Sequence, residues 1–382
     1  MFKNVITFIK DTHKKEGSIY LHEPIFIGNE KKYLNDCIDT TFVSSVGKYV
    51  TQFEEIISAF SGTNYAVATA NGTSALHIAL EIVGVDERCE VITQPLTFIA
   101  TANAVSYCGA KPIFVDVDKD TLGLSPIKLK NFLDEFATLN DNGDCINQST
   151  GKVIKACVPM HTFGHPCRID EIVAICNVYN IAVVEDAAES LGSYYKGQHT
   201  GSFGKVGIFS FNGNKIITTG AGGMLVTNDE QLAKKAKHLT TTAKIAHPYE
   251  YVHDQIGYNY RLTNIAAALG VAQMENIELF LKQKRKLARA YKTFFEQTDI
   301  EYVKEPVNCQ SNFWLNSIVL NNRKSRDDFL GYAIQNGIVA RPIWTLMNKL
   351  DMFKHCQIGS LQNSEWLGDR VINIPSSSLL KL

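Results

Sequence analysis

One stretch of the chain decides the fold class: AVATANGTSALHIAL, residues 66–80. It begins with a short apolar run, Ala66-Val67-Ala68, which has the length and composition of a buried strand. The turn Asn71-Gly72-Thr73-Ser74 follows, and residues 75–80 then place apolar side chains at helical spacing. The stretch therefore predicts a strand that passes through a tight turn into a helix.

The same alternation recurs through residues 60–230. Further strand-like runs lie at 91–93, 112–116, 153–158, 182–184 and 206–209, and a helical segment is expected around 97–107. Strands separated by helices are typical of βαβ units. We therefore predict an α/β fold with a largely parallel sheet that has helices on both faces.

The C-terminal third has a different pattern. Residues 261–297 form a long, charged helical pattern in which Gly270 is the only glycine, and residues 314–320 alternate like a strand before a helix near 325–336. Three segments are therefore expected: a large domain over 1–260, its N-terminal segment 1–50 as a candidate for packing across domains, and a linker helix with a small α+β domain over 261–382.

Composition excludes several classes of protein. The chain has 382 residues, 45% of them apolar, and a formal net charge of -1, which argues against a grip on nucleic acid or on an anionic membrane. Its nine cysteines show no metal-ligand spacing, so we expect reduced thiols and no metal site. No stretch has the length and apolarity of a signal peptide or a membrane span. These features predict a soluble, cytoplasmic protein.

Lys215 is the strongest candidate for chemistry. It follows the strand-like run 206–209 and the turn Asn212-Gly213-Asn214, and the small residues Thr218–Gly223 come next. A lysine here could be an ordinary surface residue. The small neighbours favour function, because they let a bulky planar group approach the backbone. An amine beside a glycine-rich cradle and a carboxylate indicates a Schiff-base site for pyridoxal 5'-phosphate (PLP).

The carboxylate of this site is expected at the end of another strand, in the pair Glu185-Asp186. Asp186 could simply cap the next helix. Our hypothesis is that it lies beside a pyridine nitrogen and keeps it protonated, so that the ring can accept electrons. Glu189 is a candidate for orienting the cofactor or substrate, with an ordinary exposed acid as the alternative.

Other candidates follow strands, where the ligands of parallel sheets collect. The turn Gly72-Thr73-Ser74 could bind a phosphate at a helix N-terminus, with Ser210 adding a hydroxyl, or it could be a plain helix cap. Phe98 could stack on a flat ring or lie in the core. His161 could contact the cofactor or substrate, or it could be structural.

These residues resemble the DegT-type sugar aminotransferases, vitamin-B6 enzymes of fold type I. The resemblance covers most of the chain and is carried by six segments: 71–80, 95–103, 158–164, 184–192, 208–227 and 257–270.

The resemblance implies a role for each matching residue. Lys215 matches the lysine that forms the imine with PLP and shuttles protons, and Asp186 matches the partner of the pyridinium. Ser210 and Gly72-Thr73-Ser74 match the phosphate cradle, and Phe98 matches the stacking aromatic. Asn259 matches a residue that reaches the phosphate held by a neighbouring subunit, which implies a homodimer with shared sites. Arg261, in the last segment, is a further candidate for contact with the substrate.

A finer resemblance concerns the substrate. Glu189, together with residues 21–33, 42–48 and 340–344, looks like the branch that acts on nucleotide-linked N-acetylated 4-keto-6-deoxy sugars, as in legionaminic acid and bacillosamine pathways. The implied reaction moves the amino group of L-glutamate to C4 of a UDP-linked sugar and releases 2-oxoglutarate.

Four alternatives remain open at this point. They are an aminotransferase for a GDP-linked or 3-keto sugar, a sugar dehydratase on the same scaffold, a non-catalytic PLP-binding regulator, and a generic nucleotide-binding α/β protein. Lys215 argues against the dehydratase, because those relatives lack the imine-forming lysine. The generic protein is disfavoured because no G-x-G-x-x-G or Walker-type loop follows a strand.

Overall fold

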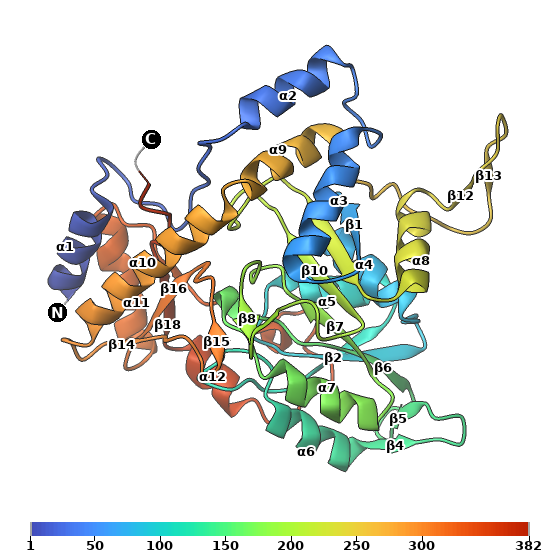
Figure 1. Ribbon diagram of the computed structural model, residues 1–382. Coiled ribbons are helices and arrows are strands. Elements are labelled where there is room, and N and C mark those ends of the chain that lie inside the picture. The colour runs from blue at the N-terminus through green and yellow to red at the C-terminus, as the bar shows by residue number, and fades with distance from the viewer. Residues whose placement is uncertain (1, 381–382) are drawn as a thin grey trace.

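A nine-stranded sheet forms the centre of the computed structural model, which describes residues 2–380 (Figure 1). Seven strands run in the order β1-β11-β10-β7-β6-β2-β3, and β4 and β5 extend the sheet beside β6. Their bounds are β1 (Tyr65–Thr69), β2 (Cys89–Thr93), β3 (Lys111–Phe114), β4 (Ala137–Leu139), β5 (Cys145–Asn147), β6 (Val153–Val158), β7 (Ala182–Asp186), β10 (Val206–Ser210) and β11 (Gly223–Thr227).

The central strands of this sheet are parallel, as the sequence predicts. Strands β10, β7, β6, β2 and β3 pair in parallel, whereas β11 runs antiparallel between β1 and β10. The predicted α/β class with a mostly parallel sheet is therefore confirmed. Because the parallel strands share one direction, the ends of β7 and β10 lie at the same edge.

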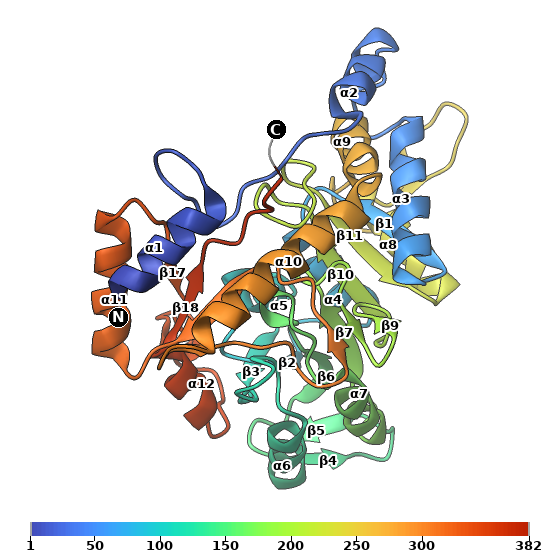
Figure 2. The ribbon, with the colours of Figure 1, turned by 60° about the vertical axis from the view of Figure 1, so that its left-hand side comes forward.

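Helices cover both faces of the sheet (Figure 2). Neighbouring residues of one strand belong to different apolar clusters: Val184 of β7 packs with α4 and α8 residues, while Val183 packs with α6 and α7 residues. The helices are α1 (Phe2–His13), α2 (Glu30–Asp39), α3 (Lys48–Ser61), α4 (Gly72–Ile82), α5 (Ile99–Tyr107), α6 (Pro126–Phe136), α7 (Ile169–Val178), α8 (Glu230–Thr240), α9 (Asn264–Met274), α10 (Ile277–Phe295), α11 (Arg323–Gln335) and α12 (Gln362–Gly368).

The single long helix predicted over 261–297 is wrong. Two helices, α9 and α10, meet at Glu275 and Asn276, and Asn276 has the non-helical dihedrals φ -113° and ψ 8°. The axes of α9 and α10 differ in direction because the two helices pack against different parts of the protein. Helix α9 packs against α2 and α3, whereas α10 buries one apolar stripe under the C-terminal sheet, with Leu287 and Tyr291 in that core.

A second, antiparallel sheet lies in the C-terminal part of the chain. Its order is β14-β16-β18-β17, with bounds β14 (Glu301–Tyr302), β16 (Asn316–Val319), β17 (Arg341–Pro342) and β18 (Val371–Ile374). Helices α1, α10 and α11 share its apolar cluster, so α1 lies beside segments almost three hundred residues away (Figures 1 and 2). The division into two domains at residue 260 stays a prediction.

Residues 19–23 form an extended strap that joins these parts. Ile19 exchanges backbone hydrogen bonds with Gly337 and Val339, both 2.9 Å. Leu21 O accepts a hydrogen bond of 2.7 Å from Ser376 N. The strap therefore crosses from α1 toward the end of the chain.

The remaining elements are short and include both exposed and buried segments. They are the three-stranded sheet of β8 (Tyr194–Tyr195), β9 (Gln198–His199) and β15 (Cys309–Gln310), the hairpin of β12 (Lys244–Ile245) and β13 (Val252–His253), and two single 3₁₀ turns (Thr162–Gly164 and Met347–Lys349). The hairpin extends away from the body (Figure 1). Among the helices of residues 2–380, none combines the length and the hydropathy needed to cross a bilayer.

Candidate active site

A cavity of about 760 Å³ opens where the carboxyl ends of the central strands meet the C-terminal sheet. Seven of the residues predicted from the sequence line it: Gly72, Thr73, Phe98, Asp186, Glu189, Ser210 and Lys215. The opposite side is built by the strap residues Tyr20, Leu21 and His22 and by residues 341–345. The cavity therefore brings together chain segments from both ends of the sequence.

Lys215 points into this cavity from the turn after β10. The turn is held by hydrogen bonds from Lys215 N to Asn212 O (3.0 Å) and from Phe211 N to Gly222 O (2.7 Å). The side chain of Lys215 is 14% exposed, and its Nζ lies 3.2 Å from Oε1 of Glu189. Its other neighbour is Trp314, whose ring centroid is 3.7 Å from Nζ.

The acid pair at the end of β7 divides between two environments. Asp186 lines the cavity, and its Oδ2 accepts a hydrogen bond of 2.7 Å from Thr101 Oγ1. Glu185 points into the protein, where it accepts from the backbone N–H groups of Gly201 (2.8 Å), Phe203 (2.6 Å) and Gly204 (2.7 Å). Burial raises the pKa of Asp186, while the Thr101 hydroxyl lowers it. Of the two acids, Asp186 is thus the one that a bound molecule can reach.

The turn before α4 forms another part of the cavity wall, through residues 71–73. Asn71 caps the helix, because its Oδ1 accepts from Ser74 N at 2.8 Å. The first N–H groups of a helix have no intrahelical partner, so those of Gly72 and Thr73 suit an anion. A Cβ on Gly72 would lie only 2.9 Å from Cβ of Ser210. Glycine is therefore needed for this close approach, although Ser74 itself is buried and does not line the cavity.

These groups fit PLP. An imine-forming amine at Lys215, a carboxylate at Asp186 and a helix N-terminus beside Ser210 match the aldehyde, the ring nitrogen and the phosphate of that cofactor. The Gly72 backbone leaves room that any side chain would fill. Phe98, which is 50% exposed at the cavity, is free to lie against a ring.

Glu189 is buried, with 3% of its surface exposed. Burial raises the pKa of Glu189 to about 7, and the nearby Lys215 opposes this rise. The second carboxylate oxygen accepts a hydrogen bond of 2.9 Å from Phe163 N. Phe163 adopts a left-handed φ of 57°, an unfavourable conformation for a bulky residue that the surrounding contacts have to impose. The alternative of an ordinary exposed acid does not fit this position.

Besides Ser74, three predicted residues lie outside the cavity. His161 is fully buried, and its Nε2 lies 3.0 Å from Oε2 of Glu185. Arg261 donates to Oε1 of Glu54 at 2.9 Å. Asn259 is exposed, on a backbone bridge to Thr241. Within one chain, the structure does not bring these three side chains to Lys215, and their functional roles stay predictions.

Several residues of the cavity were not singled out from the sequence. Thr101 does not line the cavity itself but donates to Asp186 from behind; it lies three positions after Phe98 at the start of α5, a helical spacing that could have identified it. Three others, Trp314, Tyr20 and Asn373, come from segments that are far in sequence from the carboxyl ends of the parallel strands. No local pattern places such residues beside Lys215.

Comparisons with known proteins agree with this geometry. The model of the DegT/DnrJ/EryC1/StrS aminotransferase family matches residues 25–382. The chain is 38% identical to a GDP-perosamine synthase of Escherichia coli O157:H7 (94% of this chain, 93% of the relative) and 35% identical to that of Vibrio cholerae (94% of each). A solved aminotransferase from Brucella abortus has a TM-score of 0.83 and 26% identity, over 91% of this chain and 90% of the other.

The predicted family and cofactor are therefore confirmed, whereas the finer branch around legionaminic acid and bacillosamine is not. Aminotransferases of this family depend on PLP, for which the cavity has fitting groups at each end. The chain belongs to the DegT/DnrJ/EryC1/StrS family and is a PLP-dependent sugar aminotransferase.

Proposed function

We propose that the enzyme moves the amino group of L-glutamate to C4 of a UDP-linked 4-keto-6-deoxy-N-acetylhexosamine. The observation that supports the sugar part of the proposal is the position of the residues behind the finer resemblance, whereas the choice of UDP rests on that resemblance alone. Leu21, His22, Glu189 and residues 341–344 all line the cavity that contains Lys215. They are therefore placed where a sugar substrate would be discriminated.

A GDP-linked sugar is the second candidate. The relatives at 38% and 35% identity are named for GDP-perosamine, a nucleotide-linked amino sugar, and their names favour GDP over UDP. Both candidates need the same amine chemistry at Lys215. They differ in the nucleotide and in the substituents of the sugar.

The residues of this chain divide the work of either reaction. Bound PLP supplies an acceptor for the electrons of the broken C–H bond. Lys215 Nζ takes the proton from the amino donor and returns it, and Asp186 favours a protonated ring nitrogen. The N–H groups at the start of α4 and the Ser210 hydroxyl hold the phosphate.

We also propose that the site is completed by a second copy of the chain. Asn259 is exposed, lies outside its own cavity, and follows the projecting hairpin 244–253, in which Tyr249 and Tyr251 are 80% and 82% exposed. Mixing a Lys215→Ala subunit with an Asn259→Ala subunit should restore activity, because one intact site then forms in each mixed dimer. Without such recovery, Asn259 does not act across subunits.

The substrate assignment is tested with a panel of nucleotide keto sugars. Purified enzyme is incubated with L-glutamate and with UDP-linked, GDP-linked, 4-keto and 3-keto sugars, and products are identified by mass spectrometry and NMR. We expect the largest kcat/KM for the UDP-linked N-acetylated 4-keto sugar. A larger value for a GDP-linked sugar would transfer the assignment to the second candidate. Formation of 2-oxoglutarate without any sugar separates an enzyme from a non-catalytic PLP-binding regulator.

A further inference from the structure

Trp314 and Glu189 enclose the amine of Lys215 from two sides. We propose that these two residues form an amine-binding site, which holds the Lys215 ammonium whenever Nζ is not bonded to the cofactor. Trp314 thereby positions the proton that Lys215 moves. The inference rests on the proposed role of Lys215 as the reacting lysine, and it adds a residue for which the sequence offers no signal.

The contacts of Nζ are those of a bound cation. Nζ lies 3.7 Å from the centroid of the Trp314 ring and 3.2 Å from Oε1 of Glu189. The face of an indole is the aromatic surface that attracts a cation most strongly. Trp314 is 4% exposed, so water competes little for this contact.

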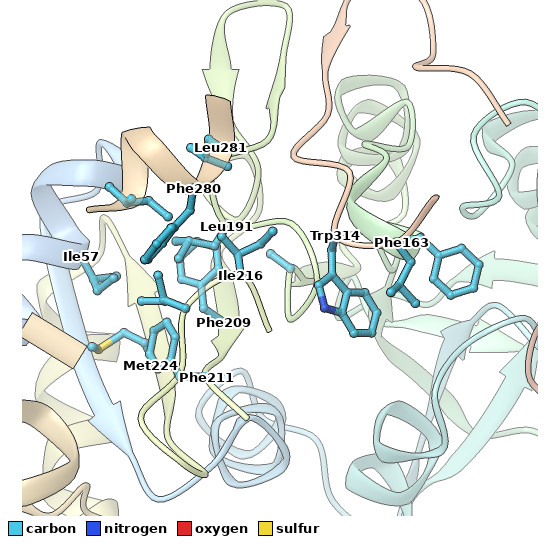
Figure 3. Packing of buried hydrophobic residues seen from close by; sticks show 14 of the residues in the cluster. Ile57, Phe163, Leu191, Phe209, Phe211, Ile216, Met224, Phe280, Leu281 and Trp314 are labelled. Atoms are coloured by element: carbon cyan, nitrogen blue, oxygen red, sulfur yellow. The ribbon is translucent and has the colours of Figure 1, made fainter. Parts of the chain in front are cut away.

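The indole is fixed in place at both ends. Its Nε1 donates to Asn214 O at 2.5 Å, in the same turn that carries Lys215. Its backbone N donates to Asn312 Oδ1 at 2.8 Å, and its backbone O accepts from Lys284 Nζ at 2.8 Å. Figure 3 shows the indole within the apolar cluster, beside Phe163. Such anchoring is more than a simple cavity wall requires.

The carboxylate side of the site is connected to the same anchor. The side-chain amide of Asn312, which is fully buried, donates to the backbone O of Glu189 at 2.9 Å. A Cβ on Gly164 would lie 1.8 Å from Asn312 Oδ1, so the Asn312 side chain occupies the space that any side chain at position 164 would need. Asn312 therefore bridges the backbones of Trp314 and Glu189.

The amine-binding site has a consequence for proton transfer. When the C–H bond of the amino donor breaks, its electron pair passes to the bound cofactor and its proton goes to Nζ, which becomes a cation in a largely buried place. A desolvated contact between a cation and an indole contributes about 2 kcal/mol, which corresponds to roughly 30-fold in rate. Replacing Trp314 by Leu should therefore slow proton abstraction by about that factor.

The contact itself can be tested without turnover. The chain has three tryptophans, Trp314, Trp344 and Trp366, so protein labelled with ¹⁵N-tryptophan gives three indole N–H resonances, which single Trp→Phe variants assign. In cofactor-free protein, Lys215→Met should move the Trp314 resonance and leave the other two unchanged. Trp366 provides a control, because Lys119 lies 4.2 Å from its ring centroid and, of the two lysine variants, only Lys119→Met should move its resonance; Arg370, 4.8 Å from the same centroid, is unchanged in both. An unmoved Trp314 resonance in Lys215→Met would overturn the proposal.

A second experiment tests the role of Trp314 in proton transfer by measuring the exchange of the Cα hydrogen of L-glutamate with D₂O. We expect Trp314→Leu to keep the visible absorbance of the lysine-bound cofactor, to slow exchange about 30-fold and to raise the α-deuterium isotope effect, with Trp314→Phe in between. Trp366→Phe should exchange like the wild type. Exchange within about twofold of the wild type in Trp314→Leu refutes the positioning role. If Lys215→Ala retains exchange, the proposed role of Lys215 fails instead, so the two failures are distinguishable.

Discussion

Replacing Glu189 by Gln tests the electrostatics of the site most directly. The substitution keeps the shape and the acceptor for Phe163 N, but it removes the titration of a carboxyl whose pKa is raised to about 7 by burial. Because the folded-state pKa lies above the unfolded value of 4.5, the folded protein binds the proton more tightly. Glu189 therefore costs no stability below pH 4.5, and its cost grows as the pH rises from 4.5 to about 7.

The size of the effect follows from the shift. Raising the pKa from 4.5 to about 7 corresponds to about 3 kcal/mol when the carboxyl is fully ionised. Between pH 5 and pH 8, the cost should grow by about 2 to 3 kcal/mol. No discount for solvent screening is needed, since Glu189 is only 3% exposed.

The assay is urea unfolding of the cofactor-free wild type and Glu189→Gln at pH 5, 6, 7 and 8. Other buried groups titrate in this range. Burial lowers the pKa of His165 and of His199 to about 4, for example, but these terms cancel in the difference between the two proteins. We expect the stability of Glu189→Gln relative to wild type to rise with pH. A difference that stays constant within about 0.5 kcal/mol would show that Glu189 is ionised throughout, and the reasoning from burial would be wrong.

Three further predictions concern the cofactor side of the cavity. Thr101→Val removes the hydroxyl that donates to Asp186 at 2.7 Å, so the pKa of Asp186 should rise further and kcat/KM for L-glutamate should fall roughly 10- to 100-fold. Gly72→Ala forces a Cβ toward Ser210, so PLP titration should show about tenfold weaker binding, whereas Gly331→Ala, which meets no atom within 4 Å, should bind PLP normally. Lys215→Ala should lose both the visible absorbance of lysine-bound PLP and all transamination; retained transamination would refute its assignment.

The residues that follow parallel strands could be found from the sequence. Gly72 and Lys215 come soon after β1 and β10, Asp186 is the last residue of β7, and the ends of β7 and β10 share one edge of the sheet. Side-chain direction was harder to predict. Met160 lines the cavity but its neighbour His161 points inward, and the same alternation separates Asp186 from Glu185. The backbone of a strand makes successive side chains point to opposite faces. Which side chain faces the cavity at the end of a strand depends on tertiary contacts.

Contacts between distant segments could not be predicted from local patterns. Trp314 lies about a hundred residues after Lys215 and reaches it through the packing of the C-terminal sheet. The break between α9 and α10 is similar, because Glu275 and Asn276 are tolerated within helices and only the different partners of the two helices require the turn.

Glu189 is placed to compensate for changes in the charge of Lys215 during the catalytic cycle. Asp186 and Glu189 are two buried carboxyls that share one lysine, and the charge of Asp186 is among the causes that raise the pKa of Glu189. When the proton is on Nζ, the ammonium favours an ionised Glu189 at 3.2 Å. When Nζ is neutral or bonded, the charge that lowers the pKa of Glu189 is lost, so that pKa rises further and the carboxyl takes up a proton instead. The site would thus keep nearly the same net charge through the catalytic cycle, and Glu189→Gln should remove from each half-reaction the pH dependence that a carboxyl with a pKa of about 7 adds to the wild type.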